Sequence, residues 1–236
     1  MGIYVGDKRY APYIGDKRRR YMGGGSPLPT GYIQDGLVFH LDGSECTSNS
    51  WVDKVNNVSL DITPSNKTAT VTDGGVVFNG DYCFYNTAYI PPAQSTSTIE
   101  ITMLMGSGGG TQRMVVYTSD SSAICYSYNN TSNGVWIKAT TTPTRGGAGN
   151  NVLFTQSISA ALNIINGTKN TTSGVNVNRG VGYCFCIGAM ITAANLAFSR
   201  NALGTLYQVR IYNRQLTEAE MLHNQQIDME KYGINT

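Results

Sequence analysis

Short segments with strand character, separated by turn signals, follow one another from residue 36 almost to the C-terminus. In STIEITMLM, apolar residues occupy every second position from Ile99 to Met105, which is the period of a strand with one buried face. Asp-Gly, Gly-Gly and Asn-Gly pairs at 73–75 and 79–80 are typical of tight hairpin turns. About a dozen such segments at close spacing predict an all-β fold, an antiparallel β-sandwich.

One stretch has the pattern of a helix, LTEAEMLHNQQIDMEKYG at 216–233. Thr217 and Glu220 are spaced as a capping box, in which each side chain bonds the backbone N–H of the other residue. Gly233 suits the left-handed position that ends a helix. The sequence therefore predicts a β-sandwich followed by one short C-terminal helix.

Basic charge is concentrated at the N-terminus. Residues 1–25 hold six lysines and arginines against two aspartates, whereas the rest of the chain holds 11 basic and 13 acidic residues. The same segment contains a near-repeat, YVGDKR at 4–9 and YIGDKR at 13–18, followed by glycines and prolines typical of a linker. We therefore divide the chain into an extended N-terminal arm at 1–25, a linker at 26–35 and a β-domain at 36–236.

The arm has the composition of a docking segment. Its Tyr-Val-Gly and Tyr-Ile-Gly units are suited to adding strands to another protein's sheet, with the basic side chains pairing to an acidic rim. A nucleic-acid-binding arm is disfavoured because Asp7 and Asp16 recur inside the basic repeats, and a solvated, disordered tail is the remaining alternative. The predicted docking residues are Tyr4, Lys8, Arg9, Tyr13, Lys17, Arg18, Arg19 and Arg20.

Targeting signals are missing from the sequence. We find no apolar run of the ~20 residues that a membrane span needs, and charges begin at Asp7, so we expect neither a membrane segment nor a signal peptide. The five cysteines are odd in number and scattered. We expect them to be reduced thiols of a protein made in a cytoplasm.

Three segments resemble a known family. LYQVRIYNRQLTEAEMLHNQQID at 206–228 resembles the closing strand and helix of laminin-G-like, concanavalin A-like jelly-roll domains. GLVFHLDGS at 36–44 and GGVVFNGDYCFY at 74–85 resemble their opening strand and a later strand pair. The resemblance implies a concanavalin A-like jelly roll, a fold that hosts enzymes, lectins and adhesion modules.

The arm resembles the N-terminal segments of bacteriophage virion proteins, especially tail-associated proteins and fibres. This resemblance implies a virion structural protein, made in the host cytoplasm, which docks on other virion proteins and is present as a homo-oligomer or in many copies. Its jelly roll is then expected to serve capsid decoration or adhesion to glycans on the host surface. The alternatives are an adhesion module of a bacterial surface protein and a glycan-cleaving enzyme.

The catalytic patterns that we looked for are missing from the sequence. Retaining glycosidases set two carboxylates about 5 Å apart, which those of this fold class place on one strand, but Glu100 stands alone in its segment. The only histidines are His40, in the first predicted strand, and His223, in the predicted helix, which disfavours a Ser-His-Asp arrangement. We therefore expect no catalytic residues and no enzyme.

A glycan site needs an aromatic platform with polar groups beside it. Tyrosines and tryptophans near polar loops are the candidates, with core packing as the alternative. Aspartates at turn positions could bind calcium, although turn formation is the preferred explanation for them, and no other cofactor is expected. The candidate glycan-binding residues are Trp51, Tyr126, Tyr128 and Trp136, and the candidate calcium ligands are Asp42, Asp73 and Asp81.

Overall fold

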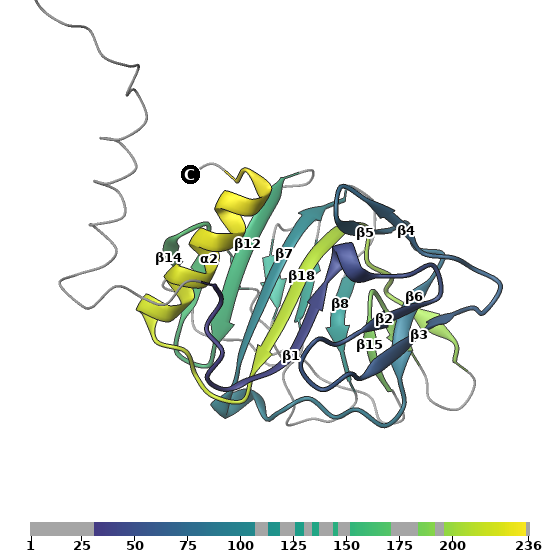
Figure 1. The fold of residues 1–236 in the computed structure, drawn as a ribbon, viewed down its shortest axis with the longest axis horizontal. Helices are drawn as coiled ribbons and strands as arrows, with labels where there is room; N and C mark the ends of the chain where they lie inside the picture. The colour runs from purple at the N-terminus through teal and green to yellow at the C-terminus, as the bar shows by residue number, and fades with distance from the viewer. Residues whose placement is uncertain are drawn as a thin grey trace, which may run out of the picture.

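In the part of the chain that the structure describes, the protein is an antiparallel β-sandwich with one helix packed on its outside (Figure 1). The computed structural model describes residues 31–106, 113–118, 126–129, 134–136, 144–145, 152–170, 184–191 and 196–234. The predicted all-β sandwich with a short C-terminal helix is therefore confirmed. The predicted arm lies outside the described residues.

Two eight-stranded sheets form the sandwich, and a short hairpin is added to it. The sheet beside the helix, here the helix-side sheet, consists of β14 (Thr168–Asn170), β13 (Asn163–Ile165), β12 (Leu153–Ser159), β7 (Thr98–Met105), β18 (Gly204–Tyr212), β5 (Gly75–Phe78), β4 (Thr70–Thr72) and β1 (Leu37–Asp42). The other, here the far sheet, consists of β11 (Thr144–Arg145), β10 (Gly134–Trp136), β9 (Tyr126–Asn129), β8 (Arg113–Tyr117), β15 (Phe185–Ile187), β6 (Cys83–Asn86), β3 (Ser59–Thr63) and β2 (Ser50–Val52). The hairpin is β16 (Met190–Ile191) with β17 (Phe198–Ser199), and the short 3-10 turns are η1 (Gly43–Glu45) and η2 (Gln94–Thr96).

Strand β18 is the central strand of the helix-side sheet. One of its edges pairs with β7 over nearly its whole length, from Gly204 opposite Met105 to Tyr212 opposite Thr98. Its other edge is shared by β5, which pairs with residues 204–206, and β1, which pairs with residues 208–212. A β-bulge interrupts the β18–β7 register between Leu206 and Gln208.

The main core lies between the two sheets. Alternation along β7 sends Ile99 and Ile101 inward, and Phe39, Trp51 and Phe154 join them from other strands. A smaller apolar cluster lies against the far sheet and includes residues 189–191 of the hairpin region. Three of its members are cysteines, Cys83, Cys184 and Cys186, and all three are buried.

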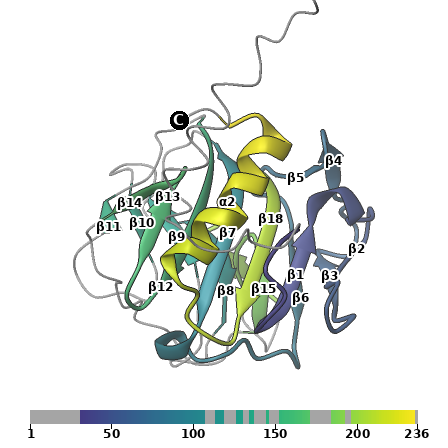
Figure 2. The same ribbon diagram turned by 60° about the vertical axis from the view of Figure 1, so that its left-hand side comes forward.

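Helix α2 (Glu218–Tyr232) begins and ends where the sequence indicates. Both bonds of the Thr217–Glu220 capping box are present, and Gly233 ends the helix in the left-handed region with φ of 67°. The helix lies across the outer face of the helix-side sheet, over β12, β7 and β18 (Figure 2). Within the described residues, no helix is long and apolar enough to cross a bilayer.

Candidate functional site

The outer face of the helix-side sheet is polar where α2 crosses it. Glu100 and Thr102 of β7 face the helix because alternation sends their neighbours into the core. The buried side of the helix is equally polar, so the two elements meet through hydrogen bonds and charges rather than through a wide apolar contact. The buried helix residues are Met221, Asn224, Gln225 and Asp228.

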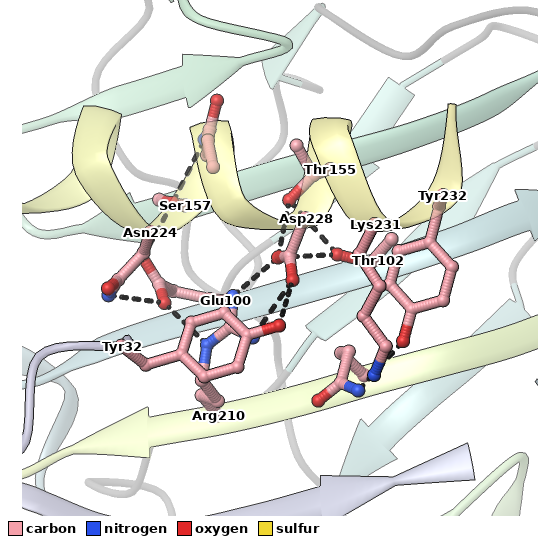
Figure 3. Close-up of polar contacts among 12 residues, drawn as sticks. Tyr32, Glu100, Thr102, Thr155, Ser157, Arg210, Asn224, Asp228, Lys231 and Tyr232 are labelled. Atoms are coloured by element: carbon pink, nitrogen blue, oxygen red, sulfur yellow. Dashed lines mark hydrogen bonds and ion pairs between the residues drawn. The ribbon is translucent and has the colours of Figure 1, made fainter. Parts of the chain in front are cut away.

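Arg210 of β18 lies at the centre of this polar layer (Figure 3). Its Nε donates to Oε2 of Glu100 at 2.9 Å, and its Nη1 and Nη2 donate to the two oxygens of Asp228 at 3.1 and 2.5 Å. The ring of Tyr32 covers the guanidinium, whose Cζ lies 3.9 Å from the ring centroid. All three charged side chains are 0 % exposed, so this ion cluster is closed to solvent.

Neutral donors complete the surroundings of both carboxylates. Oε1 of Glu100 accepts from the Ser157 hydroxyl at 2.8 Å, and Oε2 accepts from Nδ2 of Asn224 at 2.9 Å. The carboxylate oxygens of Asp228 accept hydrogen bonds from the hydroxyls of Tyr32, Thr102 and Thr155, at 2.8, 2.8 and 3.1 Å. These bonds join the helix to β7, β12 and β18, and buried charges require such complete pairing.

The charges of the cluster depend on one another. Burial raises the pKa of Glu100, and the attraction of Arg210 opposes that rise. Desolvation acts to lower the pKa of Arg210, but the attraction of Asp228 and Glu100 outweighs it and raises that pKa well above its ordinary value. The enclosed cluster offers no face to a substrate, and its geometry makes it the anchor of α2 on the sheet.

Residues 31–33, which were expected to belong to a linker, are bound to the same helix. The carbonyl of Gly31 lies 2.8 Å from Nε2 of His223, and the N–H of Ile33 donates to Oδ1 of Asn224 at 2.9 Å. The hydroxyl of Tyr32 donates to Oδ1 of Asp228 at 2.8 Å. The chain therefore enters the sandwich at a point held on α2.

The polar layer opens to solvent at the C-terminal end of α2. Nε2 of His40 lies 2.6 Å from Oε1 of Gln208, whose Nε2 donates to the Tyr232 hydroxyl at 2.8 Å. Burial, and after it the charge of Arg210, lowers the pKa of His40, so the imidazole is neutral at pH 7. With a carbonyl oxygen as partner, Nε2 is the ring nitrogen that carries the proton.

An ion pair between an exposed lysine and a mostly buried aspartate lies at the same open end. Nζ of Lys231 is 3.1 Å from Oδ2 of Asp42, and their side chains are 42 % and 11 % exposed. Burial acts to raise the pKa of Asp42, but hydrogen bonds from Ser44, Gln208 and Lys231 outweigh it and hold that pKa well below its usual range. Asp42 is therefore a carboxylate at neutral pH, and its side chain is mostly buried.

The structure places one of the predicted glycan-binding residues, Trp51, in the core. Trp51 is 0 % exposed, donates its Nε1–H to the carbonyl of Asp42 at 2.9 Å and packs edge-on against Phe84. It is a core residue, because the alternation in Ser50–Val52 turns its ring inward, and it has no face for a sugar. Tyr126 and Tyr128 lie on β9 and Trp136 on the neighbouring β10, but their side chains are outside the described part of the structure.

The candidate calcium ligands do not converge. Asp42 pairs with Lys231, Asp73 occupies a turn with φ of 51°, and Asp81 lies 3.7 Å from Nζ of Lys67. Among the residues that the structure describes, no group of three or more histidine, cysteine, aspartate or glutamate side chains is placed to hold a metal ion. Calcium binding stays a prediction, as does docking through the arm, whose residues Tyr4 to Arg20 lie outside the described residues.

Sequence reasoning missed the polar layer. Glu100 was considered alone, whereas its charge partner Arg210 lies 110 positions away on a neighbouring strand. One signal was present: glutamate on one strand and arginine on another have opposite charges, although each stands where a solvent-facing residue is expected. Reading the two outward faces together as complementary would have indicated their pairing.

The fold is shared with proteins that act on or bind carbohydrates. A sialidase from Trypanosoma rangeli in complex with sialic acid matches with a TM-score of 0.57 and 19 % identity, over 91 % of this chain and 38 % of the sialidase. Domain 4 of AbnA, a GH43 extracellular arabinanase from Geobacillus stearothermophilus, in complex with arabinotriose, matches with a TM-score of 0.58 and 14 % identity, over 82 % of this chain and 100 % of that domain. At these identities the likeness shows the fold.

Searches by sequence gave no further identification. No protein-family model matches the chain, and none of the curated proteins matches it either. The laminin-G-like and bacteriophage resemblances therefore stay predictions, while the β-sandwich shared with carbohydrate-active proteins is shown.

The comparisons correct one expectation. The missing catalytic patterns led us to expect that the chain is not an enzyme, but several of the matched structures are sialidases, which are glycosidases. The expectation was wrong because it tested only two known arrangements of catalytic residues. This chain spans 38 % of the sialidase length, so the sialidase's activity does not pass to it as a finding.

Proposed function

We propose that this chain is a glycan-binding β-sandwich module. The observation that carries the proposal is the match to domain 4 of the arabinanase, which extends over that whole domain and whose structure contains arabinotriose. The matched sialidase structure also contains a sugar ligand, sialic acid. Folds host many functions, so these likenesses support the proposal and direct its test.

The finer form of the proposal is display on a bacteriophage particle. The arm would dock on other virion proteins through its repeated Tyr-apolar-Gly units and basic side chains, and the sandwich would face outward as a decoration or adhesion domain. The anchoring of residues 31–33 on α2 supports this arrangement, because a tether joined to a fixed point positions the module it carries. Many copies on one particle let millimolar single-site affinities suffice.

A glycan array tests the first proposal. The purified full chain is tagged at the C-terminus, clustered on a multivalent support and applied to neutral and sialylated glycans that include arabino-oligosaccharides. We expect selective, saturable binding that free glycan competes away. Binding to no member of a broad array would refute the module's proposed function.

Two further measurements separate the alternatives. Incubating the chain with the array glycans and measuring new reducing ends tests for hydrolysis, the activity to which the sialidase matches point. Deleting residues 1–25 tests docking: on a particle, the shortened chain should no longer be incorporated while its glycan binding persists. Unchanged incorporation would refute the docking role of the arm.

A further inference from the structure

Two tyrosines form a half-exposed aromatic pair at the open end of the polar layer. The ring centroids of Tyr207 on β18 and Tyr232 at the end of α2 lie 4.8 Å apart, with the ring planes inclined at 47°. Both side chains are half-buried, unlike the core pair of Trp51 and Phe84. The pair therefore presents apolar ring surface to solvent beside polar groups.

The β-bulge in β18 is the reason why Tyr207 faces this way. Leu206 and Val209 both point into the core, and two residues lie between them. A regular strand has only one residue between two that point to the same face. Both of these, Tyr207 and Gln208, lie on the outer side, and each contacts Tyr232. Bulges of this kind re-aim side chains and occur frequently beside functional sites.

A glycine makes room for the Tyr207 ring. A Cβ at position 75 would lie 2.8 Å from Cδ1 and Cε1 of Tyr207, closer than real Cβ contacts allow. Gly75 therefore lets the ring lie close to the β5 backbone, while the ring also contacts Tyr232. A ring held in place binds a flat ligand face at a low cost in conformational entropy.

Groups that bind hydroxyls surround the aromatic pair. Nζ of Lys231 lies 5.0 Å from the Tyr232 ring centroid and 3.1 Å from Oδ2 of Asp42, and the side chains of Lys231 and Asp42 are 42 % and 11 % exposed. Asp73 adds a second negative charge close enough to raise the pKa of Tyr207, after burial. With one ammonium and two carboxylates, the surroundings are net negative and disfavour an anionic ligand.

We propose that the Tyr207–Tyr232 pair, with Lys231 and Asp42, is a subsite for a neutral sugar ring. The tyrosine rings would contact the apolar face of the sugar, while the ammonium donates to one hydroxyl and the carboxylate accepts from its neighbour. This inference rests on the proposed glycan-binding function and adds a location and a charge preference. It predicts arabinose- or hexose-type termini as ligands and excludes sialic acid from this subsite.

Ligand-observed NMR and calorimetry on the full chain test the site, with arabinotriose and neutral hexose oligosaccharides as probes and sialyllactose as the anionic comparison. We expect Tyr207→Ala to weaken neutral-glycan binding about tenfold and Tyr207→Phe to keep most of it, because the ring is retained. Lys231→Gln is expected to weaken binding several-fold. Tyr85→Ala, at a half-buried tyrosine on the far sheet, is the matched control and should bind as the parent does.

Each outcome decides between the two proposals. A parent chain that binds no glycan refutes the proposed function and this site with it. A parent chain that binds neutral glycans while Tyr207→Ala and Lys231→Gln bind equally well refutes the site alone. Should Tyr207→Ala fail to fold, Lys231→Gln still gives the test, and binding of sialyllactose that Lys231→Gln abolishes would overturn the charge preference.

Discussion

Replacing Arg210 by methionine tests whether the ion cluster anchors α2. Methionine fills much of the same volume but removes the three hydrogen bonds to Glu100 and Asp228 and the cation over the Tyr32 ring. Two carboxylates then remain in a site that is closed to solvent. Removing one partner of a buried ion pair costs about 3–5 kcal/mol, and we expect a loss in that range at pH 7.

The loss should depend on pH in a defined direction. Without Arg210, nothing of equal strength opposes the burial that raises the folded-state pKa of Glu100 above its unfolded value, so the folded variant holds more protons than the unfolded chain. Stability contributed in this way is complete below the unfolded pKa and is lost as pH rises through the folded pKa. Each proton that the folded variant retains lowers its free energy of unfolding by about 1.4 kcal/mol for each unit that the pH rises. The difference in free energy of unfolding between parent and variant should therefore be small near pH 4 and largest near pH 8.

Urea unfolding at 25 °C, followed by far-UV circular dichroism from pH 4 to 8, measures both effects. Adding Glu100→Gln and Asp228→Asn to Arg210→Met should restore more than half of the lost stability at pH 7, because the buried charges are then gone. Lys54→Met is the matched control: it breaks a surface pair with side chains 37 % and 52 % exposed and should cost less than about 1 kcal/mol. A loss below about 1 kcal/mol for Arg210→Met, or a loss that does not change with pH, would refute the anchoring argument.

Three further changes have distinct expected results. Tyr32→Phe removes a hydroxyl donor from a buried carboxylate, and we expect a loss of about 1.5–3 kcal/mol in urea unfolding, whereas an unchanged midpoint would show that residues 31–33 are not held there. The hydrogen bond from Arg214 lowers the pKa of Glu220 to about 2 from its usual 4.5, so the stability it contributes is present above pH 4.5 and is lost as pH falls through about 2. Thermal unfolding between pH 2 and 6 should therefore show a shallower acid decline for Glu220→Gln than for the parent, and equal slopes would contradict this. At Gly204 (φ 119°) a Cβ would collide with backbone atoms of the β7 segment, so Gly204→Ala should lower the free energy of unfolding by about 3 kcal/mol or more. Gly167 (φ 74°) has open space around it, so Gly167→Ala should cost only about 1–2 kcal/mol. Similar melting temperatures for the two variants would contradict the steric argument.

Local rules account for the parts of the fold that the sequence predicts correctly. The capping box and Gly233 act within a few residues of each other, so the ends of α2 could be placed from the sequence. Alternation from Ile99 to Met105 likewise identified β7 and its core-facing side. These features depend on neighbours in the chain, which a sequence displays directly.

The candidate site depends on distant residues, which explains why it was not predicted. The polar face of β7 has the pattern of a solvent-facing side, and only the tertiary position of α2 turns it into a buried one. Tyr207 was not selected because a one-residue bulge, invisible in the alternation, decides which way its ring points. Trp51 was selected because it stands near polar residues, but its short strand turns it into the core.

The central place of β18 has a consequence for the order in which the protein can assemble during synthesis. Strands β1, β5 and β7 are all made before residues 204–212, yet each of them pairs with β18 in the finished sheet. Until the ribosome has released that segment, three strands have backbone edges without their final partner, and such edges readily join other chains. Completion of the helix-side sheet therefore waits until residues 204–212 have been synthesised, and a nascent chain stopped before residue 204 is expected to need a chaperone or to aggregate.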